Sequence, residues 1–163
     1  MSTSLSNVSA AATIPRLFRI MLFYLEPLCA VNGAILVLVQ PGKYIHVMTR
    51  GAVASIGDGT NFIYTELAGG WLHFVFTEAV VLRLVDDLRV WKLLCMGMLL
   101  SDVLYCHSCA QALGGWSVWL KVWQWTVEDW VVTVTTWPFM LARIAILLGI
   151  GTKARTGGSV EDR

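Results

Sequence analysis

Ionisable side chains lie within long apolar stretches of this 163-residue sequence, and three of them have the chemistry of an acid–base site. A charge at bilayer depth costs at least ~2.5–3.5 kcal/mol on insertion scales, so such residues tend to face a partner or a cavity. Glu26, His73 and Asp102 each fall near the middle of a different apolar stretch. Two carboxyls and an imidazole that converge in a low dielectric alter one another's pKa values, as general acid–base catalysis requires. We therefore expect Asp102 to donate a proton, Glu26 to be its hydrogen-bonding partner or the final base, and His73 to tune or relay the proton.

Other side chains are candidates for binding a substrate beside this central layer. They are Glu66, His107, Trp71, Phe74 and Trp137. Glu66 and His73 are spaced to share one helical face. We expect Glu66 and His107 to lie nearer the lumenal side than the central layer. The three aromatic rings are suited to shield a carbocation through cation–π attraction.

A second charged group is expected toward the cytosolic side, where Glu78 and Arg143 can meet. We predict that these two residues form a structural ion pair that ties the second apolar stretch to the fourth. The central layer has other interpretations as well. Its polar side chains also fit a set of hydrogen bonds that hold helices together, or a path for ions or protons.

Four apolar stretches are long enough to cross a membrane as helices, at about residues 17–39, 61–82, 90–113 and 127–150. A span needs about 20 apolar residues, because every backbone N–H and C=O within the hydrocarbon core needs an internal partner. Of all residues, 56% are hydrophobic and 14% are charged, against about 45–50% and 25% in average globular chains. We therefore predict an all-α fold, an integral membrane four-helix bundle.

The chain is expected to divide into a disordered cytosolic N-terminus (residues 1–13), a four-span membrane domain (14–151) and a disordered cytosolic tail (152–163). Lys and Arg are enriched on the cytosolic side of membrane proteins. The side of the termini and the second loop holds Arg16, Arg19, Arg83, Arg89, Lys92, Lys153, Arg155 and Arg163, and the opposite side holds Lys43, Arg50 and Lys121. This asymmetry predicts cytosolic termini, and we expect the membrane to be that of the endoplasmic reticulum.

Nucleic acids, metals and cofactors are not expected as partners. The formal net charge of +1 gives no bulk attraction to a polyanion. Cys106 and Cys109 form a CxxC, but no second Cys pair or spaced His follows, so no zinc site is predicted. No nucleotide-binding motif is present either. The expected partners are the membrane and an apolar small-molecule substrate or lipid, with a second copy of the chain or pathway enzymes as further candidates.

Short motifs follow one another in a definite order: Ile14-Pro15, Glu26-Pro27 with Gly33, Leu82-Arg83, Val90-Trp91, Ser101-Asp102, Asp129-Trp130, and Arg143 before Gly149-Ile150-Gly151. Over residues 14–151 this order resembles a family of small fungal four-helix membrane proteins classed as a domain of unknown function. The resemblance implies a fungal source and, since such proteins often accompany secondary-metabolite genes, a role in making a terpenoid or another apolar metabolite. In architecture the chain is also similar to integral-membrane terpene cyclases and to four-helix sterol isomerase-like proteins.

The sequence leaves three functions open. The first is a cofactor-independent cyclase or isomerase that uses acid–base chemistry on an apolar terpenoid or polyketide. The second is a non-catalytic membrane protein that binds a lipid or scaffolds the enzymes of a pathway. The third is a small transporter, which is less favoured because the four short spans lack the inverted repeats and broken helices of known transporter folds.

Overall fold

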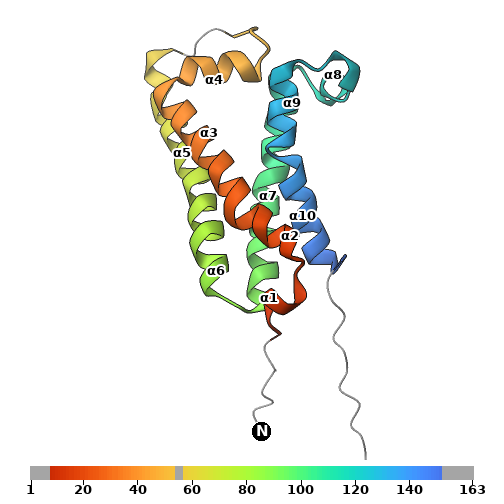
Figure 1. The fold of residues 1–163 in the computed structure, drawn as a ribbon. Helices are drawn as coiled ribbons and strands as arrows, with labels where there is room; N and C mark the ends of the chain where they lie inside the picture. Colours follow the sequence, from red (N-terminus) through yellow and green to blue (C-terminus); the bar gives the residue numbers. More distant parts are fainter. Residues whose placement is uncertain (1–7, 54–56, 152–163) are drawn as a thin grey trace, which may run out of the picture.

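The computed structural model describes residues 8–53 and 57–151, and all regular structure within these ranges is helical. Four helical segments are long and apolar enough to cross a membrane: Arg16–Val39, Asn61–Leu84, Leu88–Ala112 and Val127–Leu148. They run alongside one another, and the N-terminal and C-terminal parts of the chain lie at the same end of the bundle (Figure 1). The predicted all-helical fold with four apolar spans is confirmed, and each span begins and ends within two residues of its predicted position.

Three of the four spans are built from more than one helical segment. The first contains α2 (Arg16–Ile20), the π-helical turn η1 (Met21–Leu25) and α3 (Glu26–Val39); the second contains α5 (Asn61–Phe76), the π-helical turn η3 (Thr77–Val81) and α6 (Leu82–Leu84); the third is α7 (Leu88–Ala112); the fourth contains α9 (Val127–Val134) and α10 (Trp137–Leu148). The remaining elements are α1 (Ala10–Thr13), α4 (Pro41–Met48), η2 (Asp58–Thr60), α8 (Trp116–Trp119) and η4 (Val122–Gln124).

Capping residues fix where the later spans begin and end. The Asp87 side chain accepts bonds from two N–H groups in the first turn of α7, which satisfies donors that have no partner inside the helix. Thr126 and Asp129 form a reciprocal capping box at the start of α9. Gly149 takes a left-handed conformation with φ 73° and ends α10, as glycine commonly does after the last helical residue.

Prolines interrupt the first and fourth spans. Pro27 has no N–H to donate to the carbonyl of Phe23, and Arg83 Nη2 donates to this carbonyl instead, at 2.5 Å. Pro138 is in the first turn of α10, where the missing N–H costs little, and it separates α10 from α9. Both interruptions lie beside the buried polar groups described below.

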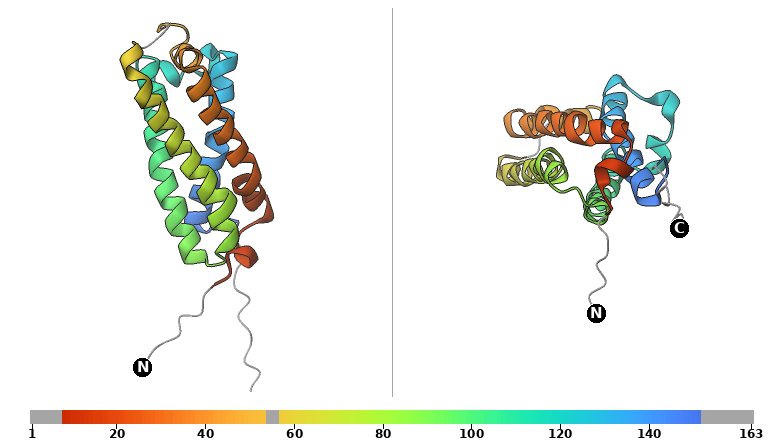
Figure 2. Two further views of the ribbon diagram at one scale, coloured as in Figure 1. Left: turned by 90° about the vertical axis from the view of Figure 1, so that its left-hand side faces the viewer. Right: turned by 60° about the horizontal axis from the view of Figure 1, so that its bottom comes forward.

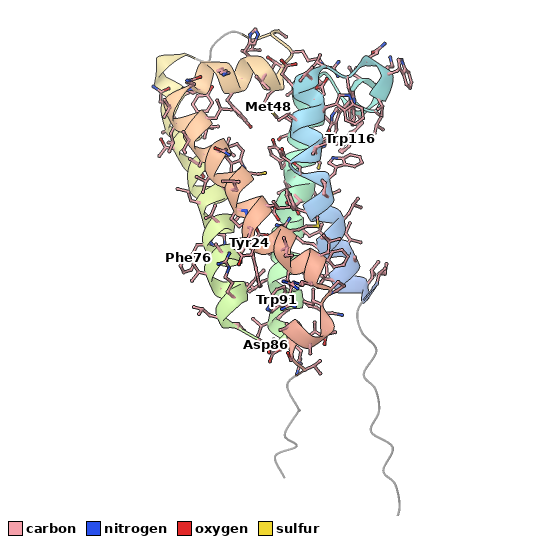
Figure 3. The ribbon with its side chains drawn as sticks, in the orientation of Figure 1. Tyr24, Met48, Phe76, Asp86, Trp91 and Trp116 are labelled. Atoms are coloured by element: carbon pink, nitrogen blue, oxygen red, sulfur yellow. The ribbon has the colours of Figure 1, made fainter. Side chains whose placement is uncertain are left out.

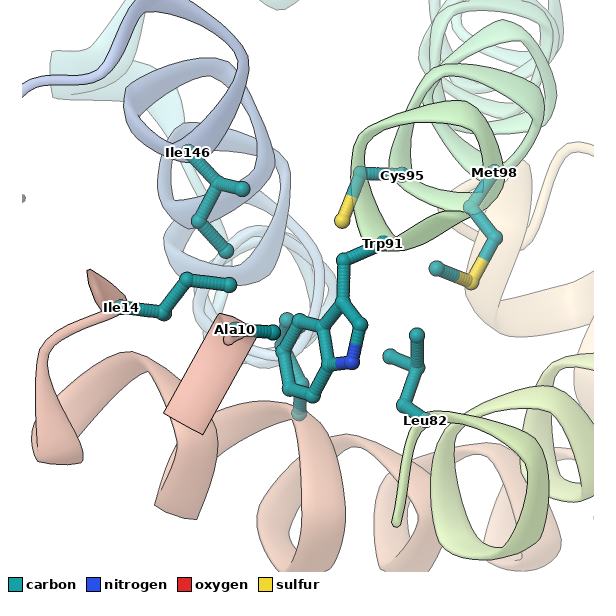
Figure 4. Packing of buried hydrophobic residues seen from close by; sticks show 8 residues of the cluster. Ala10, Ile14, Leu82, Trp91, Cys95, Met98 and Ile146 are labelled. Atoms are coloured by element: carbon teal, nitrogen blue, oxygen red, sulfur yellow. The ribbon is translucent and has the colours of Figure 1, made fainter. Parts of the chain in front are cut away.

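The half of the bundle nearest the chain termini, here called the terminal half, has one continuous core. Its buried residues are Ala10, Ile14, Leu22, Leu82, Trp91, Cys95, Met98 and Ile146, which come from α1, the turn that follows it and all four spans (Figure 4). The ring N–H of Trp91 donates to the Val85 carbonyl at 2.7 Å, so the largest ring of this core has its polar atom satisfied.

In the opposite half, here called the distal half, the core divides into two clusters. One joins α3 to α5 and contains Ala34, Val37, Tyr64 and Ala68. The other joins α7 to the loop helices and contains Met48, Cys106, Cys109, Ala110 and Trp119. The helix α3 packs along α5, α7 packs along α10, and α4 connects the two pairs through its contact with α9 (Figures 1 and 2).

Residues 8–13 differ from the expected disordered N-terminus, because α1 closes the end of the terminal half. The Ala11 N–H and the Ser9 hydroxyl each donate to Asp86 at 2.7 Å, and these bonds hold the pKa of Asp86 below its ordinary value. Ala10 is fully buried. Figure 3 shows Asp86 and Trp91 at this end and Met48 at the other. The expectations for residues 1–7 and 152–163 fall outside the described residues.

Candidate functional site

A single arginine, Arg143 of α10, lies fully buried inside the bundle. Its guanidinium contacts one carboxyl from each of the other three spans. Nη2 lies 2.6 Å from Glu26 Oε2 and 2.6 Å from Glu78 Oε1, and Nη1 lies 2.5 Å from Asp102 Oδ2. Buried charges are tolerated where they are paired at short distance. These four residues, here called the Arg143 cluster, therefore tie all four spans together at one level.

The two glutamates of the cluster lie at π-helical turns. Glu26 directly follows η1, and Glu78 lies within η3. A π-helical turn holds an extra residue, so it rotates the residues that follow it relative to a regular α-helix, and such turns are frequent at functional sites. A regular period of about 3.6 residues therefore does not describe the faces of these two spans across the turns.

The cluster merges two layers that were expected to be separate. The structure brings Glu78 and Arg143 into contact, but at the same level as Glu26 and Asp102 rather than nearer the cytosol. Arg143 makes this possible because its two terminal nitrogens reach different helices. Glu26 and Asp102 thus meet through a guanidinium.

His73 and Glu66 lie away from this cluster. Both side chains are exposed on α5, whereas Glu78 on the same span is fully buried. This difference in burial shows that His73 and Glu78 stand on different faces of the span. The expected triad is therefore corrected: Arg143, not His73, is the cationic partner of the two central carboxyls.

The other two outlying candidates, His107 and Trp137, lie in the distal half. His107 is exposed near the end of α7, where its Nδ1 accepts a bond from the Trp116 ring N–H at 3.2 Å and the two rings stack. Trp137 packs edge-on against Trp119, with ring centroids 6.0 Å apart. Neither residue lines the cavities next to the Arg143 cluster.

Two adjacent cavities lie between the helix pairs. The small cavity, of about 130 Å³, has polar groups in its wall: Glu26, Asp102, Ser101, Tyr105, Thr135 and Thr136. The chamber, of about 520 Å³, has mostly apolar walls, including Leu36, Val47, Met48, Val127, Val131 and Val132, with Asn32, Tyr44 and Glu128 among its polar residues. Both are lined by Cys29, Gly33, Trp71, Tyr105 and Thr135. Because they share these walls, the two cavities adjoin, and the small polar cavity lies on the side of the Arg143 cluster.

The carboxyls of the cluster differ in how they meet this space. Asp102 and Glu26 line the small cavity and are 6% and 8% exposed, whereas Glu78 is 0% exposed. Asp102 contacts Arg143 through Oδ2 and Glu26 does so through Oε2, so each carboxyl has a second oxygen that is not used in this contact. Asp102 and Glu26 are therefore the members of the cluster that a bound molecule can reach.

Aromatic rings border the same space. Trp71 packs edge-on between Tyr44 and Tyr105, with ring centroids 5.8 Å and 6.3 Å away. Phe74 lines the small cavity and also lies near the cluster, since Arg143 Cζ is 5.3 Å from its ring centroid. Of the predicted aromatic site residues, Trp71 and Phe74 lie at the cavities.

The distal end of the chamber is closed by α4, which contributes Tyr44, Val47 and Met48 to its wall. The residues that follow α4 are fastened to α9: Arg50 Nη2 lies 2.8 Å and its Nε 2.9 Å from Asp129 Oδ2. Arg50 reaches this position with φ 48°, in the left-handed region, which is uncommon for a residue other than glycine. The ion pair holds α4 across the two helix pairs.

Several residues of this site have weak signals in the sequence. Tyr105 follows Asp102 by three positions, a spacing that places both on one face of α7. The contact of Arg50 with Asp129 joins positions 79 residues apart, and no local pattern indicates it. Among the described residues, no group of three or more His, Cys, Asp or Glu side chains is arranged to hold a metal ion.

The fold and the cluster together define a class: a helical protein with four apolar spans and a buried charge cluster, in which one arginine contacts three carboxyls, beside an apolar cavity. Within this class, the chain belongs to the family described as a domain of unknown function (DUF7704), whose model matches residues 11–153. No curated protein and no solved structure matches the chain.

Proposed function

We propose that this protein is an integral membrane enzyme that isomerises or cyclises an apolar small molecule by acid–base chemistry, without a cofactor. One observation carries the proposal: Asp102 and Glu26, which share a buried guanidinium, line a small polar cavity that adjoins an apolar chamber. Ligand pockets typically have volumes of about 300–1,000 Å³ and combine apolar walls with a few converging polar groups. The chamber has this size and character.

In the proposed reaction, the carboxylic acid of Asp102 gives its proton to an alkene carbon or an epoxide oxygen of the substrate. Positive charge then develops on the substrate, and the electron-rich faces of Trp71 and Phe74 stabilise it. The Glu26 carboxylate removes a proton from a neighbouring carbon, and a double bond forms. One proton enters and one leaves, so the product is an isomer of the substrate and no oxidant or reductant is consumed. The cycle closes when the proton passes from Glu26 back to Asp102.

Arg143 and Glu78 have a positioning role in this proposal. Arg143 fixes the two reacting carboxyls at one end of the space, and Glu78, which lines neither cavity, contacts the same Nη2 as Glu26. Such preorganised charges lose no energy to reorganisation during the reaction. His73, Glu66 and His107 have no role, because their exposed side chains do not line either cavity.

We further propose that the substrate is a terpenoid or polyketide of fungal secondary metabolism and that the protein resides in the endoplasmic reticulum with cytosolic termini. The apolar chamber fits a hydrocarbon skeleton. The resemblance described above supports the pathway, and the excess of Lys and Arg at the terminal end supports the orientation.

A second candidate is a non-catalytic protein that binds a lipid or scaffolds pathway enzymes. It is favoured by the fact that Arg143 is completely enclosed and bonded to every other span, as expected of a purely structural cluster. The two candidates differ in one respect: only an enzyme needs an ionisable group at the two cluster positions that face the cavity.

The test compares metabolite profiles, by liquid chromatography and mass spectrometry, of strains with the intact gene, a deletion, Asp102→Asn or Glu66→Gln. Equal amounts of each variant in the membrane are verified first. We expect Asp102→Asn to lower product formation by about 10²–10⁴-fold and to accumulate an isomeric precursor, as the deletion does. Glu66→Gln is the matched control, because it neutralises an exposed carboxyl that lines neither cavity, and it is expected to form product. If Asp102→Asn forms product at the full rate, the catalytic proposal is wrong and the second candidate is favoured.

A further inference from the structure

The two cavities differ in size and in chemistry, and the difference describes the molecule that would fill them. The chamber is about four times larger than the small cavity, at about 520 Å³ against 130 Å³. The small cavity has two carboxyls and four hydroxyl side chains in its wall. The chamber is lined mainly by aliphatic and aromatic groups, although Asn32 and Glu128 also contribute to its wall. A molecule with a long apolar body and a polar end beside Glu26 and Asp102 matches this distribution.

The boundary between the two cavities includes Gly33 on α3, Trp71 on α5 and Tyr105 on α7, which line both. The Trp71 ring lies directly over Gly33, so closely that a Cβ added at Gly33 would be 2.9 Å from both Cε3 and Cζ3 of the ring. Carbon atoms do not approach so closely without repulsion. The absence of a side chain at Gly33 is therefore what allows Trp71 to lie back against α3.

The Trp71 ring is also held from its other sides. Tyr44 and Tyr105 pack edge-on against it, at 5.8 Å and 6.3 Å between centroids. A ring pushed away from Gly33 must therefore move into the space that it lines. A broad polycyclic head would likewise have to displace Trp71 to reach Asp102, whereas a chain end would not.

We propose that Gly33 and Trp71 determine specificity, because they form a passage that admits only the slim, oxygen-bearing end of an elongated apolar substrate to Asp102 and Glu26. The substrate body stays in the chamber, and its terminal hydroxyl, carbonyl or epoxide oxygen enters the small cavity. This inference rests on the proposed function for the reaction, but it makes its own prediction about binding.

The experiment measures equilibrium binding of tritiated farnesol, an elongated alcohol with a terminal hydroxyl, to the full chain in lipid nanodiscs. Unlabelled farnesol and farnesane, the saturated hydrocarbon with the same carbon skeleton and no hydroxyl, serve as competitors. The variants are Gly33→Ala, Gly33→Ala combined with Trp71→Phe, and Asp102→Asn. Gly69→Ala on α5 is the matched control, because a Cβ there meets nothing within 4 Å.

We expect Gly33→Ala to weaken farnesol binding by about tenfold or more, since the terminal hydroxyl loses its bond to a charged group. Farnesane is expected to compete equally well in every variant, because it occupies the chamber alone. The smaller ring in the double variant makes room for the added Cβ and restores farnesol binding, and Gly69→Ala leaves it unchanged. If Gly33→Ala weakens the binding of farnesol and farnesane equally, or weakens the binding of neither, the proposed passage is wrong.

Failure of the proposed function gives a different result. Asp102→Asn retains a hydrogen-bonding side chain and is expected to bind farnesol but to stop product formation in the metabolite profile. Asp102→Asn could form product normally while Gly33→Ala still weakens the binding of farnesol but not of farnesane. In that case the acid role of Asp102 is wrong and the proposed passage is supported. Gly33→Ala could instead change the binding of farnesol and farnesane equally, or not at all, while Asp102→Asn loses product. In that case the proposed passage is wrong and the acid role of Asp102 is supported.

Discussion

The terminal and distal halves of this bundle use the same four spans in different ways. In the terminal half one continuous core joins α1 to every span, and the Arg143 cluster lies next to it. In the distal half the core separates into two clusters, one for each helix pair, and the cavities lie between the pairs. Packing in one half thus holds the spans together while the other half leaves space for a ligand.

The two halves also differ in how their charges are held. Arg143 is completely buried and contacts three carboxyls. The ion pair of the distal half has one carboxylate, and its Arg50 side chain is 22% exposed. Ion pairs shielded from water interact strongly and are costly to break, whereas partly exposed pairs are weaker. Variants in the terminal half should therefore affect folding most, and variants in the distal half should affect access to the chamber.

The largest effect is expected from Arg143→Met, which would leave three buried carboxyls without their shared cation. Removing one partner of a buried ion pair typically costs about 3–5 kcal/mol, so we expect little folded protein and a strongly lowered Tm in detergent. Arg89→Met is the control, because Arg89 is exposed at the start of α7. If Arg143→Met unfolds at the same temperature as the wild type, the cluster does not hold the terminal half together.

A smaller effect is expected from Arg50→Met, which releases α4 from α9. Asp129 keeps its bond from the Thr126 N–H, at 2.7 Å, so its carboxylate is not left unpaired. We expect a loss of about 1.5 kcal/mol, at the low end for a hydrogen bond to a charged group, and faster amide hydrogen exchange confined to α4. Lys43→Met, an exposed change on the same helix, should leave exchange unaltered. Equal exchange in α4 of both variants would show that the ion pair does not close the chamber.

The smallest effect is expected from pH, at the contact of α1 with Asp86. The pKa of Asp86 is lower in the folded protein than its ordinary value, so this contact stabilises the fold above about pH 3.9 and is lost as pH falls through the lower folded value. Exchange of residues 8–13, corrected for its intrinsic pH dependence, should therefore rise only in acid. Asp86→Asn should raise the exchange of residues 8–13 at neutral pH. Glu66→Gln, at an exposed site near the start of α5 in the distal half, should not. A contact that persists unchanged in Asp86→Asn would contradict this.

The spans could be predicted from sequence because each is a long apolar run, a property that local composition records. Glu26, Glu78, Asp102 and Arg143 stood out for the same reason, since charges within such runs are costly. Their common level could not be predicted, because η1 and η3 change the phase of two spans and an arginine reaches across helices. His73 was misplaced because its depth, taken from its position in the span, does not specify which face of α5 carries it.

The cavities could not be predicted, because they depend on how the helix pairs diverge. Residues far apart in the chain form the walls, and the ion pair of Arg50 with Asp129 links the turn after α4 to the first turn of α9. Gly33 was visible as a small residue in the first span, but only its contact with Trp71 explains why a side chain there would matter.

The proposal that the cavities bind an oxygen-bearing apolar molecule is tested most directly by identifying the molecule that the protein retains. Wild-type protein, Ala30→Phe and Gly69→Ala would be purified from membranes under identical conditions, and the extracts compared by liquid chromatography and mass spectrometry. Ala30 lines the small cavity, so the larger ring would fill it, whereas Gly69 lies away from other side chains. We expect one oxygen-bearing apolar molecule to be enriched over bulk lipid in the wild type and in Gly69→Ala, and depleted in folded Ala30→Phe. The same bulk lipid composition in all three extracts would contradict it.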